Sequence, residues 1–449
     1  MKRLIFAFLF CAFTNFLSAQ TNVSGGIYAN TTWTLANSPY ILTDTVVVFP
    51  GVTLSIEPGV TIKFDDGQRL EVRNGTLIAQ GTNSQPITFT SNSSSPVAGS
   101  WDRVYLNQTT SGGIYTYCKF SYAKIGLLYV AAFLDTIHIS NCNFDNNIKG
   151  ISMGSGGYAF MDSSNFNHHD EACKLVCGKI NHCSFMYDNY GVEGNEFCSI
   201  TNSTARYCAE IAFTSIDSVI NCVVKNCGTG ISGAYTRYCD VDSCFTGIVA
   251  GDVSHCNIRH NTIGIGSSDV IKYNVIEFDS IGIYIESNCQ NFPDSIYCNK
   301  ICSNDAYGFM NECSFSKSVR NNYWCTTDSA LVASYIYDGY DNVSSGLVSF
   351  MPIDTQQCYL NNIGTFIPVV KNTSITIYPN PATNEIKISN LSQSENQIKI
   401  FNLLGQQVKS IAISNEQNTT INISDLPIGL YELTIFDGEK ISCKKLVKE

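Results

Sequence analysis

Seven segments of the chain repeat one spacing, in which a cysteine, once replaced by asparagine, stands eight residues before a glycine. The second residue after the cysteine and the residue directly after the glycine are apolar in every segment. The two positions hold Cys118, Cys142, Cys183, Cys222, Cys239, Cys256 and Asn274, and Gly126, Gly150, Gly191, Gly230, Gly247, Gly264 and Gly282. The closest repeats are 17–18 residues apart. An internal repeat of about 20 residues is typical of a solenoid.

The pattern inside each repeat favours strands over helices. Side chains two positions apart point to the same side of a strand, so the cysteine and the apolar residue after it share a buried face. No segment has the 3.6-residue periodicity over about 10–12 residues that a helical solenoid needs. One strand per turn, stacked about 4.8 Å above its equivalent, makes a parallel β-helix. We therefore predict an all-β chain with a β-helix of about thirteen turns, roughly 60 Å long.

Two further positions of the repeat predict its corners. The repeated glycine is expected at a corner, because glycine tolerates positive φ. The third position before that glycine often holds a residue that adopts the left-handed conformation and bonds nearby backbone, which predicts a turn ladder. Its polar members are Asn147, Asp188, Asn261 and Asp279.

A column of charged residues is expected on the outer face of the same strands. Three positions after the cysteine column the charges alternate in sign along Lys225, Asp242, Arg259 and Glu277. Each charge then lies between two opposite ones on neighbouring turns, and each exposed pair contributes about 0.2–1 kcal/mol. The column predicts a solvated stripe that neutralises itself and fixes the register of the strands.

The first residues have the features of a secretory signal peptide. Lys2 and Arg3 precede a short apolar run, and small residues follow at Ser18 and Ala19. The run is too short for a membrane span, and we expect cleavage that removes residues 1–19. No other segment approaches the roughly 18 consecutive apolar residues of a membrane-spanning helix.

The C-terminal segment, residues 373–449, is predicted to form a small Ig-like antiparallel β-sandwich, since short alternating strands are separated by Pro, Gly and Asn turns. It resembles the type A C-terminal sorting domain of type IX secretion substrates. The resemblance is carried by Tyr378-Pro379-Asn380-Pro381, the run 402–406, Gly429-Leu430-Tyr431 and Lys445. It implies that residues 373–449 bind the type IX machinery and direct the protein across the outer membrane to the cell surface or the medium.

The segments that flank the repeats resemble secreted bacterial right-handed parallel β-helix proteins. The matching pieces are 54–64, 75–82, 86–91 and 100–104 at the start, and the closing segment 321–352. The resemblance implies a right-handed β-helix with both its caps over residues 20–352, followed by a linker over 353–372.

The charge of the β-helix argues against nucleic acid as a partner. Of 27 basic and 38 acidic residues, eight of each lie from Lys371 onward and two basic ones lie in the first 19 residues. The remainder holds 17 basic and 30 acidic residues, a net charge of −13. A body this acidic repels polyanions.

Eighteen of the 20 cysteines lie between Cys118 and Cys358. Export suggests disulfides, but equivalent positions on stacked strands are about 4.8 Å apart, wider than the 3.5–4.5 Å that a disulfide needs between Cβ atoms. We therefore expect buried free thiols in the columns. Disulfides are expected where the columns are irregular, for example Cys173/Cys177, Cys298/Cys302 or Cys222/Cys227. Metal binding by Cys173, Cys177 and His182 is a weaker alternative, because no CxxC pair supports it.

No catalytic group stands out. A uronate lyase needs a base with Arg or Lys, often beside calcium, but the candidates Arg103, Lys174, Arg206 and Arg259 share no column of the repeat. A glycoside hydrolase needs two carboxylates about 5–10 Å apart, and Asp240 and Asp242 face outward together, yet Asp242 already belongs to the charged column.

Two other groups of residues are candidate sites. The run 167–171, with His168, His169, Asp170 and Glu171, falls at a turn and is interpreted as a solvated loop. Tyrosines near the turns can stack on sugar rings, although half-buried tyrosine is the commoner outcome. They are Tyr187, Tyr190, Tyr207, Tyr235 and Tyr238.

Two functions remain open. The first is a non-catalytic protein of the cell surface or outer membrane, or a secreted one, with a role in adhesion, carbohydrate binding or the envelope. The second is a polysaccharide lyase or glycoside hydrolase on the same scaffold. The sequence favours the first, because the outward charges pair with one another and no acid/base cluster converges. No catalytic, cofactor-binding or metal-binding residue is assigned, and calcium is the one cofactor left open.

Overall fold

The regular secondary structure of the computed structural model is almost entirely β-strand. The structure describes residues 20–109, 113–131, 136–154, 157–195, 197–266, 268–289, 293–359, 376–389, 391, 395–402, 407–414, 418–437 and 440–449. The signal peptide predicted for residues 1–19, most of the run 402–406 and much of the predicted linker lie outside these residues. The chain divides into two compact units, Met1–Gly364 and Thr365–Glu449.

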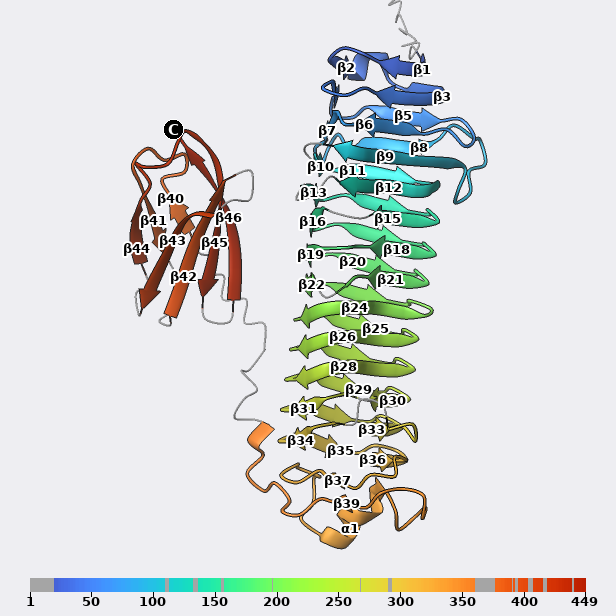
Figure 1. Ribbon diagram of the computed structural model, residues 1–449, viewed down its shortest axis with the longest axis vertical. Helices are drawn as coiled ribbons and strands as arrows, with labels where there is room; N and C mark the ends of the chain where they lie inside the picture. The colour runs from blue at the N-terminus through green and yellow to red at the C-terminus, as the bar shows by residue number, and fades with distance from the viewer. Residues whose placement is uncertain are drawn as a thin grey trace, which may run out of the picture. The chain divides into compact units, whose positions relative to one another are not determined.

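The first unit winds as a parallel β-helix of about 12 turns, close to the predicted thirteen (Figure 1). Its strands form three faces, which we call A, B and C. Face A holds β6 (Leu70–Arg73), β9 (Trp101–Thr109), β12 (Ala123–Ala131), β15 (Lys149–Met153), β18 (Glu171–Lys174), β21 (Tyr190–Glu193), β30 (Ile263–Ile265), β33 (Ile281–Ile285), β36 (Tyr307–Asn311) and β38 (Ile336–Tyr337). Every ladder in this unit is parallel, including that of β1 (Thr21–Ile27), the first strand, with β3 (Tyr40–Val48).

Faces B and C repeat the same stacking. Face B holds β2 (Thr31–Trp33), β4 (Thr53–Ile56), β7 (Thr76–Gln80), β10 (Ile114–Thr116), β13 (Thr136–Ser140), β16 (Tyr158–Asp162), β19 (Gly178–Asn181), β22 (Cys198–Thr201), β31 (Val270–Lys272) and β34 (Ser295–Tyr297). Face C holds β5 (Thr61–Phe64), β8 (Ile87–Ser91), β11 (Cys118–Ser121), β14 (Asn143–Asp145), β17 (Asn165–Asn167), β20 (Ser184–Met186), β23 (Thr204–Arg206), β25 (Val223–Lys225), β27 (Asp240–Asp242), β29 (Asn257–Arg259), β32 (Val275–Glu277) and β35 (Lys300–Cys302). Three long strands bend from face A into face B, namely β24 (Ile211–Ile220), β26 (Thr229–Arg237) and β28 (Thr246–Ser254).

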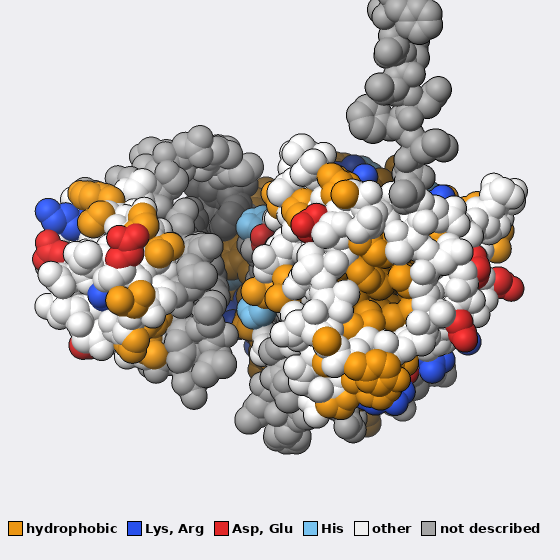
Figure 2. All heavy atoms as spheres, turned by 90° about the horizontal axis from the view of Figure 1, so that it is seen from above, with side chains coloured by type: hydrophobic (Ala, Val, Ile, Leu, Met, Phe, Trp, Pro, Cys, Tyr) orange, Lys and Arg blue, Asp and Glu red, His pale blue; other side chains and the backbone are white. Residues whose placement is uncertain are grey.

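The core is a set of inward columns, one residue per turn, as the repeat predicted. Five phenylalanines stack face to face with ring centroids 4.7–4.9 Å apart, along Phe89, Phe120, Phe144, Phe166 and Phe185. Viewed from the N-terminal end, hydrophobic side chains gather in the centre of the β-helix, and mostly backbone and other side chains surround them (Figure 2). The strand spacing sets the ring spacing, so stacking extends through the rod.

The repeated glycines correct one prediction, because none of them has positive φ. They lie inside strands of face A, where the position of a Cβ would be directed at the backbone of the next coil. A Cβ on Gly230 or Gly247 would lie 2.5 Å from the backbone oxygen of the residue one turn on. The column requires small residues for close packing, and Ala172 and Ala212 occupy it in two turns.

From the coil of β11 onward, positive φ recurs at the two corners on either side of face C, at residues other than glycine. One corner column holds Tyr117, Asn141, Ser163, His182, Asn202, Asn221, Tyr238, His255, Tyr273, Cys298 and Asn321, and the other holds Tyr122, Asn146, His168, Tyr187, Tyr207, Asn226, Ser243, His260, Phe278 and Ser303. The predicted turn residues Asn147, Asp188, Asn261 and Asp279 are one position further on, and they are buried. The turn ladder exists, but its side chains point into the rod.

These buried side chains accept hydrogen bonds from the backbone of the preceding coil. The backbone N–H of Ala123 donates to Oδ1 of Asn147, and that of Cys244 donates to Oδ1 of Asn261, both at 2.8 Å. In a second inner column, the acceptor for the backbone N–H is a hydroxyl, a side-chain amide or a thiol, depending on the coil. The N–H of Cys142 donates to Ser164 Oγ at 3.1 Å, and that of Cys118 donates to Cys142 Sγ at 3.5 Å. Cysteine therefore replaces serine or asparagine as a small buried acceptor.

As predicted, the cysteines divide into free thiols in the inward columns and disulfides elsewhere. The predicted disulfide pairs were wrong. Between Cys118 and Cys358 twelve cysteines are free, and eleven of these are buried. The three disulfides are Cys289–Cys313, Cys298–Cys358 and Cys302–Cys325. Cys173, Cys222 and Cys227 stay free because they lie in regular inward columns. Disulfides form where positive φ turns the side chain away from the column, as at Cys289, Cys298 and Cys325.

A cap follows the last coils, with β37 (Lys317–Ser318), α1 (Ser329–Ser334) and β39 (Val348–Ser349). The second unit contains two antiparallel sheets. One joins β40 (Thr376–Tyr378), β41 (Glu385–Ser389) and β44 (Asn418–Asn422), and the other joins β43 (Gln407–Ser414), β42 (Glu395–Asn402), β45 (Gly429–Asp437) and β46 (Lys440–Lys448). The described residues contain no helix that is long and apolar enough to span a membrane.

Candidate functional surface

The densest group of charges lies on the outside of face C. Asp242 pairs with Lys225 on the turn before it and with Arg259 on the turn after it, each with an N–O distance of 3.3 Å. Asp240 contacts the same two cations at 3.4 and 3.0 Å. The register of β25, β27 and β29 brings these side chains into one column, as the alternating signs predicted.

The electrostatics of this group oppose acid catalysis. Partial burial alone would raise the pKa of Asp242, but hydrogen bonds from Ser243, Lys225 and His260 hold that pKa below its usual value. A general acid in a glycosidase needs the opposite shift. Both oxygens of Asp242 are occupied, since Oδ1 accepts from Ser243 Oγ at 2.8 Å and Oδ2 from Lys225.

The four basic lyase candidates do not converge. Arg103 pairs with Asp102 at 2.8 Å, and Lys174 pairs with Glu193 at 2.7 Å on face A. The expectation that no two candidates share a column was wrong for Arg206, which lies one turn before Lys225 and so in the column of Arg259. The sequence did not reveal this, because Ser203 replaces the cysteine in that repeat.

The run 167–171 also differs from its interpretation as a solvated loop. His168 is exposed at the corner, but the side chain of His169 is fully buried, and its Nδ1 lies 2.8 Å from Oδ1 of the equally buried Asp188. Asn147 Nδ2 lies 3.3 Å from the other ring nitrogen. Glu171 is also buried and pairs with Lys149. His169 and Asp188 belong to the inner turn ladder, where no polymeric substrate reaches them.

The three residues of the weaker metal alternative lie apart in the fold. Cys173 is buried in the core, Cys177 is half-buried, and His182 interacts with Asp162 at 3.2 Å. Within the described ranges, no group of three or more His, Cys, Asp or Glu side chains is arranged to hold a metal ion.

The corner between faces C and A presents a stack of exposed rings. His168 stacks on Tyr187 with 5.2 Å between ring centroids, and Tyr187 stacks on Tyr207 with 5.0 Å. Each of the two tyrosines is nearly half exposed, and Tyr190 beside them is 38% exposed. We call these four residues the aromatic rail. Because the rings cover one another's faces, their edges and hydroxyls are what a ligand can contact.

The other two tyrosines lie elsewhere. Tyr235 is on face B, where the guanidinium of Arg237 lies 5.9 Å from its ring centroid. Tyr238 is at the corner between faces B and C, and its ring lies against that of His255 with 4.9 Å between centroids. Of the five tyrosines predicted as sugar-stacking candidates, three therefore belong to the aromatic rail and two lie at separate positions.

Two protein-family models match parts of the chain and agree with this architecture. Residues 376–449 match the family described as the secretion system C-terminal sorting domain, and residues 25–110 match the pectate-lyase like beta helix domain. No curated protein matches the chain. The chain is therefore a secreted β-helix protein with a type IX C-terminal sorting domain, which directs it to the cell surface or the extracellular space.

Proposed function

We propose that this protein is a non-catalytic rod, displayed at the cell surface or released, that binds polysaccharide along the aromatic rail. The observation that carries the proposal is the stack of exposed rings at a spacing of one turn. Tyrosine combines an apolar ring edge with a hydroxyl that donates and accepts hydrogen bonds, which suits the mixed surface of a sugar. A row of such groups along the rod axis fits an extended polymer laid along that axis.

The charge of the β-helix narrows the class of polymer. A net charge of −13 between the signal segment and residue 371 repels uronates and sulfated glycans. Near the rail, Asp170 and Glu210 are exposed acids, whereas Arg206 is the exposed cation beside Tyr207. Neutral or amino-bearing glycans are therefore the favoured ligands.

The absence of catalysis is inferred from the charged group on face C. Its two carboxylates are held by Lys225 and Arg259, and the pKa of Asp242 is lowered rather than raised. A hydrolase would need one of the two protonated at neutral pH.

The proposal is tested with the exported protein on a glycan array that includes neutral, amino-bearing and anionic polymers. We expect binding to neutral or amino-bearing chains, and at least tenfold weaker binding for Tyr187→Ala/Tyr207→Ala. Tyr235→Ala is the matched control, because Tyr235 is equally exposed on face B. Equal binding by both variants, or no binding to any glycan, contradicts the proposal.

A polysaccharide lyase is the second candidate, favoured by the match of residues 25–110 to the pectate-lyase like beta helix domain. Assays for new reducing ends and for unsaturated uronates, with and without calcium, distinguish the two. Product formation from pectin, alginate or chondroitin that Arg259→Gln abolishes supports the lyase and excludes a purely binding role.

A further inference from the structure

The chain leaves the β-helix through a short strap, residues 352–359, that lies across the last two coils. The N–H of Asn321 donates to the carbonyl of Pro352 at 2.8 Å, and the N–H of Asp354 donates to the carbonyl of Asn322 at 3.0 Å. Inner coils make two similar bonds, as when Asn221 donates to Arg237 and Asp240 donates to Cys222, with the second donor one residue further along. The strap therefore provides the hydrogen bonds that a further coil would make.

Side chains hold the strap in a defined conformation. Asp354 accepts from the backbone N–H of Gln356 at 2.8 Å and from that of Cys358 at 2.7 Å. The ring of Tyr359 is buried and stacks on Tyr323 with 5.8 Å between centroids.

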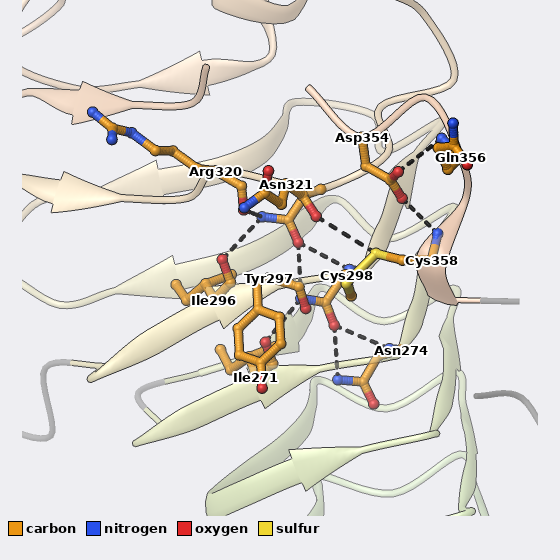
Figure 3. Close-up of a disulfide and its surroundings, with 12 residues drawn as sticks. Ile271, Asn274, Ile296, Tyr297, Cys298, Arg320, Asn321, Asp354, Gln356 and Cys358 are labelled. Atoms are coloured by element: carbon orange, nitrogen blue, oxygen red, sulfur yellow. Dashed lines mark hydrogen bonds between the residues drawn. A yellow bond between two sulfur atoms is a disulfide. The ribbon is translucent and has the colours of Figure 1, made fainter. Parts of the chain in front are cut away.

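One disulfide fixes the strap to the coil before the last. Cys298 lies at the same corner as Asn321, one turn earlier, and its N–H donates to the carbonyl of Asn321 at 2.7 Å. Its positive φ of 54° turns the side chain outward, where it joins Cys358 with 5.3 Å between Cα atoms (Figure 3). Below this corner the buried amides of Asn274, Asn299 and Asn322 continue the inner ladder to the end of the rod.

The covalent connection decides how tension enters the rod. Cys298 and Cys358 are 60 residues apart in sequence, and the segment between them contains β36 and the whole cap, including α1. Tension on the chain after residue 359 passes through the sulfur atoms into the coil of Cys298. The hydrogen bonds of the cap, which would be loaded one after another, are bypassed.

We propose that the Cys298–Cys358 disulfide is a force-bearing clasp, which keeps the end of the β-helix closed while the protein is held by its C-terminal part. The inference rests on display at the cell surface and is independent of glycan binding. The other two disulfides reinforce the same region, since Cys289–Cys313 and Cys302–Cys325 interlock with the bypassed segment.

Single-molecule stretching of the full exported chain between its two ends tests the clasp. In Cys298→Ser/Cys358→Ser the chain between Cys325 and Cys358 carries the load, and we expect a new first event at low force. About 32 residues are then released, which is roughly 110 Å of extended chain. The unaltered protein should lack this event, and its first unfolding force should be higher.

Cys302→Ser/Cys325→Ser is the matched control, because it removes one disulfide of the same region and leaves the clasp in place. It should show no early event. The clasp is refuted when the unaltered protein releases the cap first, or when the two double variants behave alike.

A second measurement leaves all disulfides intact, in case the clasp variant does not fold. A handle attached through an unnatural amino acid at Val343, which is 97% exposed inside the bypassed segment, loads the cap directly. The cap should then yield at lower force than with the handle at the C-terminus. Equal forces from the two handles overturn the proposal.

Discussion

Oδ1 of Asp279 accepts two hydrogen bonds from Asn261 one turn earlier, from the backbone N–H at 2.7 Å and from the side-chain amide at 2.9 Å. The other oxygen, Oδ2, is buried and has no hydrogen-bond partner within the described part of the chain. Other turns place asparagine in this column, as at Asn261 and Asn304, whose Nδ2 reaches a carbonyl on an earlier coil. A carboxylate here leaves one oxygen unsatisfied.

Burial raises the pKa of Asp279 from 3.8 to about 7. Because the folded state holds the proton more tightly, the contribution of Asp279 to stability is complete below pH 4 and is lost as the pH rises toward 7. Asp279→Asn should remove this dependence and raise stability at pH 8 by up to about 4 kcal/mol. Urea midpoints at pH 5 and pH 8 measure it. A variant that is equally destabilised at both pH values would show that Asp279 is needed in its charged form.

Asp242 should behave oppositely, because its pKa is lowered. Its contribution is present above the unfolded pKa and is lost as the pH falls through the folded value. Asp242→Lys places four cations in one column, together with Arg206, Lys225 and Arg259. It should cost about 1–3 kcal/mol at low salt, and less at high salt. Thermal melting at two ionic strengths checks this. Lys174→Gln is the control, since the Lys174–Glu193 pair is more than 40% exposed and should contribute little. An unchanged melting temperature for Asp242→Lys would contradict the ladder.

Gly247→Ala should destabilise the rod, since the new Cβ would lie 2.5 Å from the carbonyl oxygen of Gly264. Backbone cannot move aside cheaply between stacked coils, so we expect a loss of about 1–3 kcal/mol. Gly266→Ala is the matched control, because the closest atom there is a side-chain methyl of Val249 at 3.1 Å. Denaturant midpoints compare the two, and equal midpoints would show that the column tolerates a methyl group.

The free thiols should be almost inert in the native protein. Burial raises the pKa of the Cys183 thiol to about 12, and only Cys177 among the described free cysteines is partly accessible. Alkylation and peptide mapping should find Cys177 modified first in the native state. In denaturant without reductant, all twelve should react while the three disulfide pairs do not. Protection of Cys222, Cys239 or Cys256 in denaturant would indicate oxidation within the columns.

Much of the fold follows from the sequence because each turn repeats the same chemistry. The C-terminal sandwich follows from short alternating strands between turns. Local spacing also determines the cysteine column, the apolar columns and the alternating charges from Lys225 to Glu277. In a parallel β-helix, spacing along the chain becomes stacking between coils, so these features could be predicted without coordinates. The division between thiols in columns and disulfides outside them followed from strand spacing as well.

Only the tertiary structure decided which way each corner residue points and which distant residues meet. It placed positive φ at His168 and not at the repeated glycines, buried His169 against Asp188, and joined Cys298 to Cys358. The physical reason is that a corner is defined by two dihedral angles and by the coil above it, while the sequence specifies only the residue. The sequence determined the coil and its register; contacts between coils determined its corners, its glycines and its disulfide clasp.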